Sequence, residues 1–228
     1  MTKILNSIVH IGLHKTGTTS IQHFLQMKRD RLEQLGFHFY KGMHIDGNHV
    51  ELHAAAMRSD RTSTFKMKSN LVFDEAYLKM TSDRVREFLG KVESGSTIFS
   101  AEGLSLLRHL DETERLASIL PDEVSIIVYC RNPTDYLRSH ANQLRKSGIA
   151  DTTEKTSHAY MEADTWMADY DLRLMSFRKT FGQDNVHVID YDEVCGRDGG
   201  VIPSFLRLLN LETEFSHEDW RNIRLNQS

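Results

Sequence analysis

The sequence predicts an α/β domain of three layers, in which a central parallel sheet of about five strands is flanked by helices. Short apolar runs alternate with longer amphipathic segments along the whole chain, which is the pattern of β-α units. The runs at 8–13 and 124–130 are rich in β-branched residues and too short to span a membrane, as expected of strands buried on both faces. With 228 residues and no internal repeat, the chain is expected to form a single domain over 1–228.

The first apolar run ends in a small, hydroxyl-rich turn at 12–20. Gly12 and Gly17 allow the backbone to approach a ligand closely, and Lys15 adds a positive charge. Hydroxyl and N–H groups at the start of a helix bind anions, and the residues placed there are Thr18, Thr19 and Ser20. The turn is therefore predicted to cradle a phosphate-like group.

The same turn nearly matches the nucleotide-binding pattern G-x-x-x-x-G-K-[ST]. Gly12, Gly17 and Thr19 have the required spacing, which predicts a P-loop-like fold. Thr18 occupies the position of the nucleotide-binding lysine, however, and Lys15 comes three positions earlier. The departure disfavours an ordinary ATP or GTP site.

The first half of the chain alternates between the two kinds of element. Apolar residues at helical spacing predict a helix up to residue 35, and Pro121 ends a later one. The predicted elements, in order, are a strand at 36–40, a loop at 41–48, a helix at 48–57, a polar surface loop at 59–72, a helix at 74–92, a strand at 97–101 and a helix at 111–120.

The second half continues the alternation. The strand at 124–130 runs into Asn132 and Pro133, which are favourable N-cap and first-turn residues for the next helix. The further predicted elements are a polar loop at 147–157, a long helix at 158–181 with an aromatic stripe, a strand at 186–190 and a short helix at 203–209.

Candidate acid-base residues lie at two places. Glu102 follows the strand at 97–101, and ligands bind at the carboxyl ends of strands in open α/β sheets. A glutamate there can alternatively cap the short helix at 104–107. His49 and His53 are four residues apart and share one face of a helix. They either serve a substrate or form an exposed polar helix face.

A second anion-binding candidate follows the strand at 124–130. Arg131 stands at the strand's end, and Ser139 lies off the apolar face of the next helix, so both are free to meet a ligand. The planar guanidinium suits a phosphate because it can donate two parallel hydrogen bonds. Taken alone, Arg131 is equally explained as the cap of a strand end.

Together the two motifs resemble those of the sulfotransferases that use 3′-phosphoadenosine 5′-phosphosulfate (PAPS). The stretch 14–20 is similar to the family's 5′-phosphosulfate loop, and 131–139 to its 3′-phosphate motif, about a hundred residues later. The acidic turn at 191–195 also resembles the family's strand-plus-turn. The resemblance implies that PAPS is bound by His14, Lys15, Thr16, Gly17, Thr18, Thr19, Ser20, Arg131 and Ser139.

The resemblance also implies an activity. A sulfuryl group would move from PAPS to a hydroxyl or amine of an acceptor, releasing 3′-phosphoadenosine 5′-phosphate (PAP), without a metal. Lys15 would stabilise the leaving phosphate, and Glu102, or else His49 or His53, would take the acceptor's proton. The acceptor, whether a glycan, a lipid-linked sugar or a small molecule, is not determined by the sequence, and the segments 41–75 and 147–165 match no subfamily.

Two alternatives come from other classes. A P-loop kinase would use the same loop for ATP, but it would need a lysine at position 18 and an aspartate for Mg²⁺. A non-catalytic nucleotide-binding module would keep the loop and Arg131 without needing Glu102. The nature of the nucleotide and the need for a base discriminate between the three.

Composition limits the partners and the compartment. The net charge of −4 does not favour nucleic-acid binding, and no apolar run is long enough for a membrane span. Two isolated cysteines and a first strand close to the N-terminus predict a cytoplasmic protein with reduced thiols. The tail at 215–228 carries Trp220, Arg221, Arg224 and Asn226, which either close over a nucleotide or pack on the surface.

Overall fold

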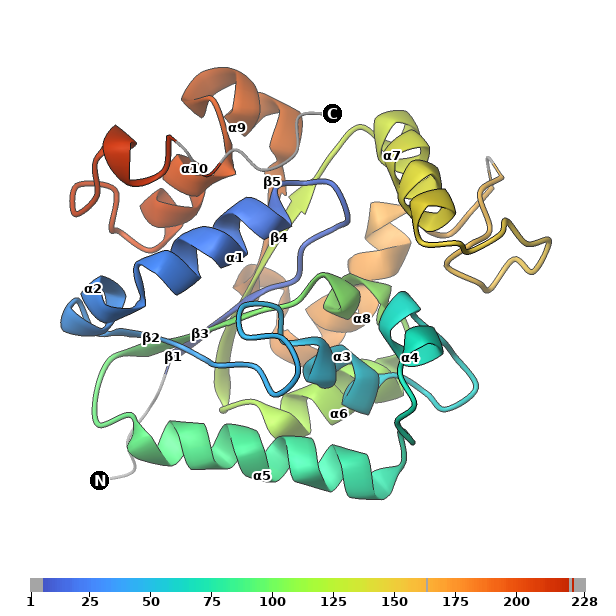
Figure 1. Ribbon diagram of the computed structural model, residues 1–228, viewed down its shortest axis with the longest axis horizontal. Helices are drawn as coiled ribbons and strands as arrows, with labels where there is room; N and C mark the ends of the chain where they lie inside the picture. Colours follow the sequence, from blue (N-terminus) through green and yellow to red (C-terminus); the bar gives the residue numbers. More distant parts are fainter. Residues whose placement is uncertain (1–5, 163, 222, 224–228) are drawn as a thin grey trace.

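The computed structural model describes residues 6–162, 164–221 and 223, and its centre is one parallel sheet (Figure 1). In spatial order the five strands are β2 (Phe37–Phe39), β3 (Ser96–Ser100), β1 (Asn6–His10), β4 (Glu123–Cys130) and β5 (Val186–Asp190). Every neighbouring pair is parallel. The predicted α/β class with a five-stranded parallel sheet is confirmed.

Helices cover both faces of the sheet, which gives the three layers (Figure 1). One face packs against α1 (Thr18–Met27), α2 (Arg29–Gln34), α9 (Tyr191–Asp198) and α10 (Val201–Leu208). The other face packs against α3 (Val50–Ala56), α5 (Glu75–Lys91), α6 (Leu110–Ile119) and α8 (Tyr170–Phe181). α7 (Pro133–Lys146) lies at the end of β4, and α4 (Thr64–Lys68) lies near α3.

Successive residues of the central strands enter opposite cores. In β1, Ile8 packs with the α1 side and Val9 with the α5 side, and neighbouring β3 repeats the pattern with Ile98 and Phe99. All four are 6% exposed or less. Burial on both faces explains why these strands are continuous apolar runs in the sequence.

The register brings three strand ends to one edge of the sheet. His10, the last residue of β1, is paired with Ser100 of β3 and with Ile127 of β4. β1 and β3 therefore end level, whereas β4 continues three residues further, to Cys130. The segments that follow, which contain Lys15, Glu102 and Arg131, all leave from this edge.

Two predicted segments differ from the structure in the first half of the chain. The helix expected up to residue 35 is interrupted at Lys28, whose non-helical backbone separates α1 from α2. The loop expected at 59–72 contains α4, because the Ser63 hydroxyl accepts a hydrogen bond from the Lys66 N–H and so caps a single short turn.

The long helix expected at 158–181 is wrong for its first half. The helix begins only at Tyr170, after Asp169 caps it by accepting from the Leu172 N–H at 2.9 Å. Upstream, the Met167 carbonyl accepts a 2.7 Å hydrogen bond from Arg173. Trp166 is buried but lies outside the helix, whereas the other members of the predicted stripe, Tyr170, Leu174 and Phe177, lie on α8.

The acidic turn expected at 191–195 is the first part of a helix, α9. Asp190, the last residue of β5, caps it by accepting from the Glu193 N–H at 2.8 Å. Elsewhere the predicted strands and helices agree with the structure to within a residue or two at most ends. None of the described helices is long and apolar enough to cross a membrane.

The packing of α1 predicts a large cost for truncating its central side chain. Phe24 is fully buried and meets Phe215 edge to face at 5.2 Å. Phe24→Ala should lower the free energy of unfolding by about 3–5 kcal/mol in urea titrations. Met27→Ala on the same helix, where the side chain is 57% exposed, should change it by less than about 0.5 kcal/mol. Equal losses would contradict this account of the core.

Candidate active site

The loop between β1 and α1 is closed by its own hydroxyl groups. The Leu13 carbonyl accepts hydrogen bonds from Thr16 Oγ1 at 2.7 Å and from Thr18 Oγ1 at 3.3 Å. A Cβ on Gly12 would lie 2.0 Å from Thr18 Oγ1, so only glycine allows this closure. The hydroxyl of Thr16 is thereby committed to the loop itself.

Two residues of this loop have left-handed backbone. Gly17, at φ 77°, precedes α1 and provides no side-chain cap, so the first N–H groups of the helix, those of Thr18 and Thr19, are left for a ligand. Lys15 has φ 65°, which is uncommon for a residue with a side chain and is characteristic of functional loops. The loop therefore leaves backbone N–H groups at the start of α1, where the sequence predicts an anion.

The second anion-binding element follows β4. The Asn132 side chain accepts from the Thr134 N–H at 3.0 Å and Pro133 occupies the first turn of α7, as the sequence predicts. Arg131 lies against the ring of Tyr191, with its Cζ 5.5 Å from the centroid, and its Nε is 3.5 Å from an Asp192 oxygen. Its guanidinium is held at the strand end while its side chain stays 28% exposed.

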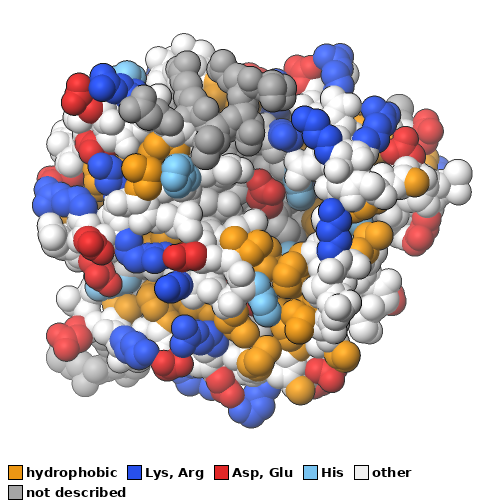
Figure 2. All heavy atoms as spheres, in the orientation of Figure 1, with side chains coloured by type: hydrophobic (Ala, Val, Ile, Leu, Met, Phe, Trp, Pro, Cys, Tyr) orange, Lys and Arg blue, Asp and Glu red, His pale blue; other side chains and the backbone are white. Residues whose placement is uncertain are grey.

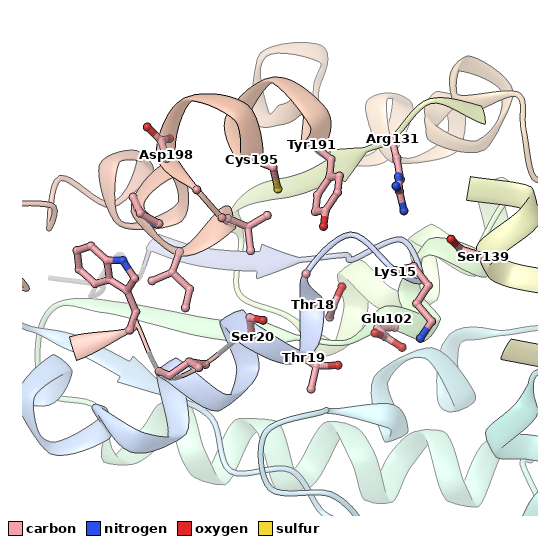
Figure 3. A pocket seen from close by; sticks show the side chains of 18 of the residues that line it. Lys15, Thr18, Thr19, Ser20, Glu102, Arg131, Ser139, Tyr191, Cys195 and Asp198 are labelled. Carbon is pink, nitrogen blue, oxygen red and sulfur yellow. The ribbon is translucent and has the colours of Figure 1, made fainter. Parts of the chain in front are cut away.

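Both elements open into one cavity of about 940 Å³ (Figure 3). The predicted site residues that line it are Lys15, Gly17, Thr18, Thr19, Ser20, Glu102, Arg131 and Ser139. In Figure 3, Lys15, Glu102 and Ser139 lie at one end and Asp198 lies towards the other, with Cys195 and Tyr191 between them. His14, Thr16, His49 and His53 are outside this lining, so a direct role for them at a ligand stays a prediction.

The far wall of the cavity was not predicted from the sequence. It is formed by α9, the turn after it and the start of α10, including Tyr191, Cys195 and the pair Gly199 and Gly200. The available signal was that glycine pair, which allows the turn between two short helices. Gly17 fits closely against this wall, because a Cβ on it would lie 2.5 Å from a methyl group of Val201.

The C-terminal tail forms part of the cavity wall, in agreement with the first of its two interpretations, closure over a ligand. Trp220, Arg221 and Ile223 line the cavity, so the described part of the tail closes over it. Arg224 and Asn226 lie outside the described residues.

Glu102 is the principal acid of the site. It begins the 3-10 turn η1 (Glu102–Leu106), and its side chain is 20% exposed. Burial raises the pKa of its carboxyl to about 7, and the Lys15 ammonium acts in the opposite direction by favouring the carboxylate. His14 approaches from behind, with Nε2 3.8 Å from a Glu102 oxygen. A carboxyl group with a pKa near 7 has the right strength for a general base.

His49 and His53 are buried, so an exposed polar helix face is the wrong interpretation. His49 Nδ1 accepts from the Ser100 N–H at 3.0 Å, and His53 Nε2 is 2.9 Å from the Ser63 hydroxyl. Burial lowers the pKa of each imidazole to about 3. The ring of His53 fits against Gly103, where a Cβ would be 2.3 Å from Nδ1. Both rings hold α3 to the sheet and η1.

The family follows from comparison with known proteins. The model of the sulfotransferase domain matches residues 5–226. The chain belongs to the sulfotransferase family. A crystal structure of a sulfotransferase from Alicyclobacillus acidocaldarius is similar, with a TM-score of 0.61 and 16% identity over 98% of this chain and 86% of that one. At 16% identity, the similarity between the two structures shows a shared fold and no more.

Two kinase structures were also found. A gluconokinase from Sinorhizobium meliloti has 13% identity, with coverage of 94% and 99% and a TM-score of 0.35. A sugar kinase from a Janibacter species has 14% identity, with coverage of 93% and 99% and a TM-score of 0.39. These overlaps are too poor to carry an argument about this sulfotransferase. No curated protein sequence matches it.

The environment of Glu102 predicts its titration. In ¹³C NMR of glutamate-labelled protein, with the Glu102→Gln variant used for assignment, its carboxyl should titrate near pH 7. Lys15→Met should raise that pKa further, because a neutral side chain no longer favours the carboxylate. Lys146→Met, another lysine of the cavity wall, is the control and should leave it unchanged. A pKa near 4 in the unmodified protein would refute this description of the site.

Proposed function

We propose that this sulfotransferase transfers the sulfuryl group of PAPS to a hydroxyl or amine of an acceptor and releases PAP. The observation that carries the proposal is that two anion-binding elements and one carboxyl with a raised pKa border the same cavity. The family supports sulfuryl transfer in general, and the choice of donor rests on those two elements.

The donor would be held at both of its charged groups, the 5′-phosphosulfate and the 3′-phosphate. The free N–H groups of Thr18 and Thr19, with Lys15, suit the 5′-phosphosulfate, while Arg131 and Ser139 suit the 3′-phosphate. The ring of Trp220 supplies an aromatic surface for the adenine at the tail side of the cavity. A nucleotide bound in this way would direct its sulfuryl group towards Glu102.

The transfer is an in-line displacement at sulfur. The acceptor's oxygen or nitrogen forms the new bond to sulfur while the bond from sulfur to the 5′-phosphate oxygen breaks, and the electron pair leaves with PAP. Lys15 and the loop N–H groups would stabilise the charge that develops on that phosphate. Glu102 would take the proton released by the acceptor. The residues thereby align the reactants and remove one proton.

The acceptor would contact the two segments that the sequence left unmatched, 41–75 and 147–165. One of them carries exposed apolar side chains, with Ile45 at 47%, Met67 at 54% and Val72 at 74% exposure. Figure 2 shows hydrophobic side chains gathered over the region of α3 and α4. A hydroxyl-bearing acceptor with an apolar portion would suit these exposed side chains.

Of the two alternative functions, a P-loop kinase and a non-catalytic nucleotide-binding module, only the second remains compatible with the family. A kinase is not proposed, because the chain belongs to the sulfotransferase family. A binding module without catalysis would share the donor site, and only the role of Glu102 separates it from the enzyme.

Donor binding can be tested without an acceptor. By calorimetry the protein should bind PAP more tightly than ATP with Mg²⁺, and Arg131→Ala should weaken PAP about 10- to 100-fold, because a hydrogen bond to a charged group is worth roughly 1.5–3 kcal/mol. Adenosine 5′-phosphosulfate, which lacks the 3′-phosphate, should bind both proteins equally. Arg138→Ala is the matched control, since that side chain is 73% exposed and outside the cavity lining. Preference for ATP with Mg²⁺ would overturn the proposal.

The base is tested by Glu102→Gln, which keeps the shape and removes the basicity. Radiolabelled sulfuryl transfer from PAPS to a panel of phenols, sugars and amines should fall about 10²-fold or more on any acceptor that the wild type sulfates. The wild-type kcat/KM should rise with pH through about 7, because the base acts as the carboxylate, and the variant should lack this rise. Full activity with normal PAP affinity would remove Glu102 from the chemistry.

A further inference from the structure

The ring of His14 lies outside the cavity, although His14 belongs to the phosphate-binding loop. Its neighbour Lys15 lines the cavity in front of Glu102, whereas His14 approaches the same carboxyl from behind, with Nε2 3.8 Å from it. On its other side the ring of His14 meets the ring of His140 edge to face, with centroids 5.0 Å apart. His14 therefore stands between Glu102 and a buried histidine of α7.

The tautomer of His140 is fixed by a backbone carbonyl. His140 Nε2 is 2.9 Å from the carbonyl oxygen of His158, and a carbonyl can only accept, so Nε2 carries the proton. Burial lowers the pKa of His140 to about 4, which keeps the ring neutral near pH 7. A neutral ring that is protonated at Nε2 has a bare lone pair at Nδ1.

The two facing rings have matching unsatisfied atoms. Nδ1 of His14 and Nδ1 of His140 are both buried, and neither has a hydrogen-bond partner among the described residues. A buried nitrogen without a partner costs stability. The bare Nδ1 of His140 needs a donor, and an Nδ1–H on His14 satisfies both, directly or through one buried water.

We propose that His140 fixes His14 as the Nδ1–H tautomer, so that His14 presents a bare Nε2 lone pair to Glu102 and acts as its positioning residue. The chain of hydrogen bonds then runs from the Glu102 carboxyl to His14, from His14 to His140, and from His140 to the carbonyl of residue 158. Which atom donates and which accepts in each of these hydrogen bonds follows from the carbonyl of residue 158, which can only accept.

This arrangement favours the protonated form of Glu102. A bare nitrogen can accept a hydrogen bond from the neutral carboxyl but has no proton for the carboxylate. The role in catalysis rests on the proposed function: the proton that Glu102 takes from an acceptor would be held by donation to His14 Nε2. Apo contacts of this kind often shorten only when substrate is bound, in agreement with the 3.8 Å separation.

The other ionisable groups around His14 and Glu102 do not reverse the preference for a neutral His14 and a protonated Glu102. His14 is faced by His53 from α3, His140 from α7, His158 from the loop before α8 and Arg173 from α8, and together with burial they lower its pKa and keep it neutral. On the Glu102 side the charged neighbour is Lys15, and the Tyr136 hydroxyl of α7 lies within its electrostatic reach. The hydrogen bonds of Arg173 go to the carbonyls of Met167 and Ser105.

The test uses the unliganded protein, so that its outcome does not depend on donor or acceptor. In long-range ¹H–¹⁵N spectra of histidine-labelled protein, His14 should be the Nδ1–H tautomer and His140 the Nε2–H tautomer. His140→Phe keeps the ring shape and its stacking on Tyr136 but removes both nitrogens. His14 should then become Nε2–H and donate to the carboxylate, which should lower the pKa of Glu102 by about one unit or more in ¹³C titrations.

The matched control is His158→Phe. It changes a neighbouring buried histidine in the same way but keeps the backbone carbonyl, so neither the tautomers nor the pKa of Glu102 should change. An Nε2–H tautomer of His14 in the wild type overturns the proposal, even where His140→Phe fails to fold. An unchanged Glu102 pKa in folded His140→Phe also overturns it. Both results leave PAP binding and the role of Glu102 in the proposed function unaffected.

Discussion

The parallel pairing of β3, β1 and β4 is the constraint on which the site depends. Parallel strands end at the same edge, so the chain that leaves β1, the chain that leaves β3 and the chain that leaves β4 are neighbours. β4 runs three residues past the partner of His10, which places Arg131 further along the strand direction than the end of β1. A donor with two charged groups on opposite sides of its ribose suits this stagger.

At this edge of the sheet, the loop between β1 and α1 determines most of the site's geometry. Left-handed backbone at Lys15 and Gly17 turns the chain sharply, and the hydroxyls of Thr16 and Thr18 fasten the turn to the Leu13 carbonyl. The sharp turn at Lys15 also lets two consecutive residues, His14 and Lys15, reach opposite sides of the Glu102 side chain. A left-handed non-glycine residue costs of order 1 kcal/mol or more, and the closed loop retains it.

Much of this arrangement was predictable from local sequence because its causes are local. Strands buried on both faces are apolar throughout, and Asn132 with Pro133 starts a helix by a well-defined cap, so the sheet, α7 and the two anion-binding elements were predicted. Trp166 and the pair His49 and His53 were misplaced because their burial depends on tertiary partners distant in sequence. The α9–α10 wall escaped prediction because 191–195 was interpreted only as an acidic turn, and the small and apolar residues 199–203 carry no charge pattern that indicates a ligand.

The pKa of Glu102 follows from a balance between burial and charge. Its pKa of about 7 lies some 2.5 units above the ordinary value of 4.5, so desolvation outweighs the Lys15 ammonium beside it. A raised carboxyl pKa favours the folded state at low pH, and the advantage is lost as pH rises from 4.5 through 7, a cost of about 3 kcal/mol above pH 7. A structural cap would avoid that cost by facing solvent. A carboxyl kept at this depth, with an ammonium in front and an imidazole behind, supports the proposal that Glu102 is the base at this end of the cavity.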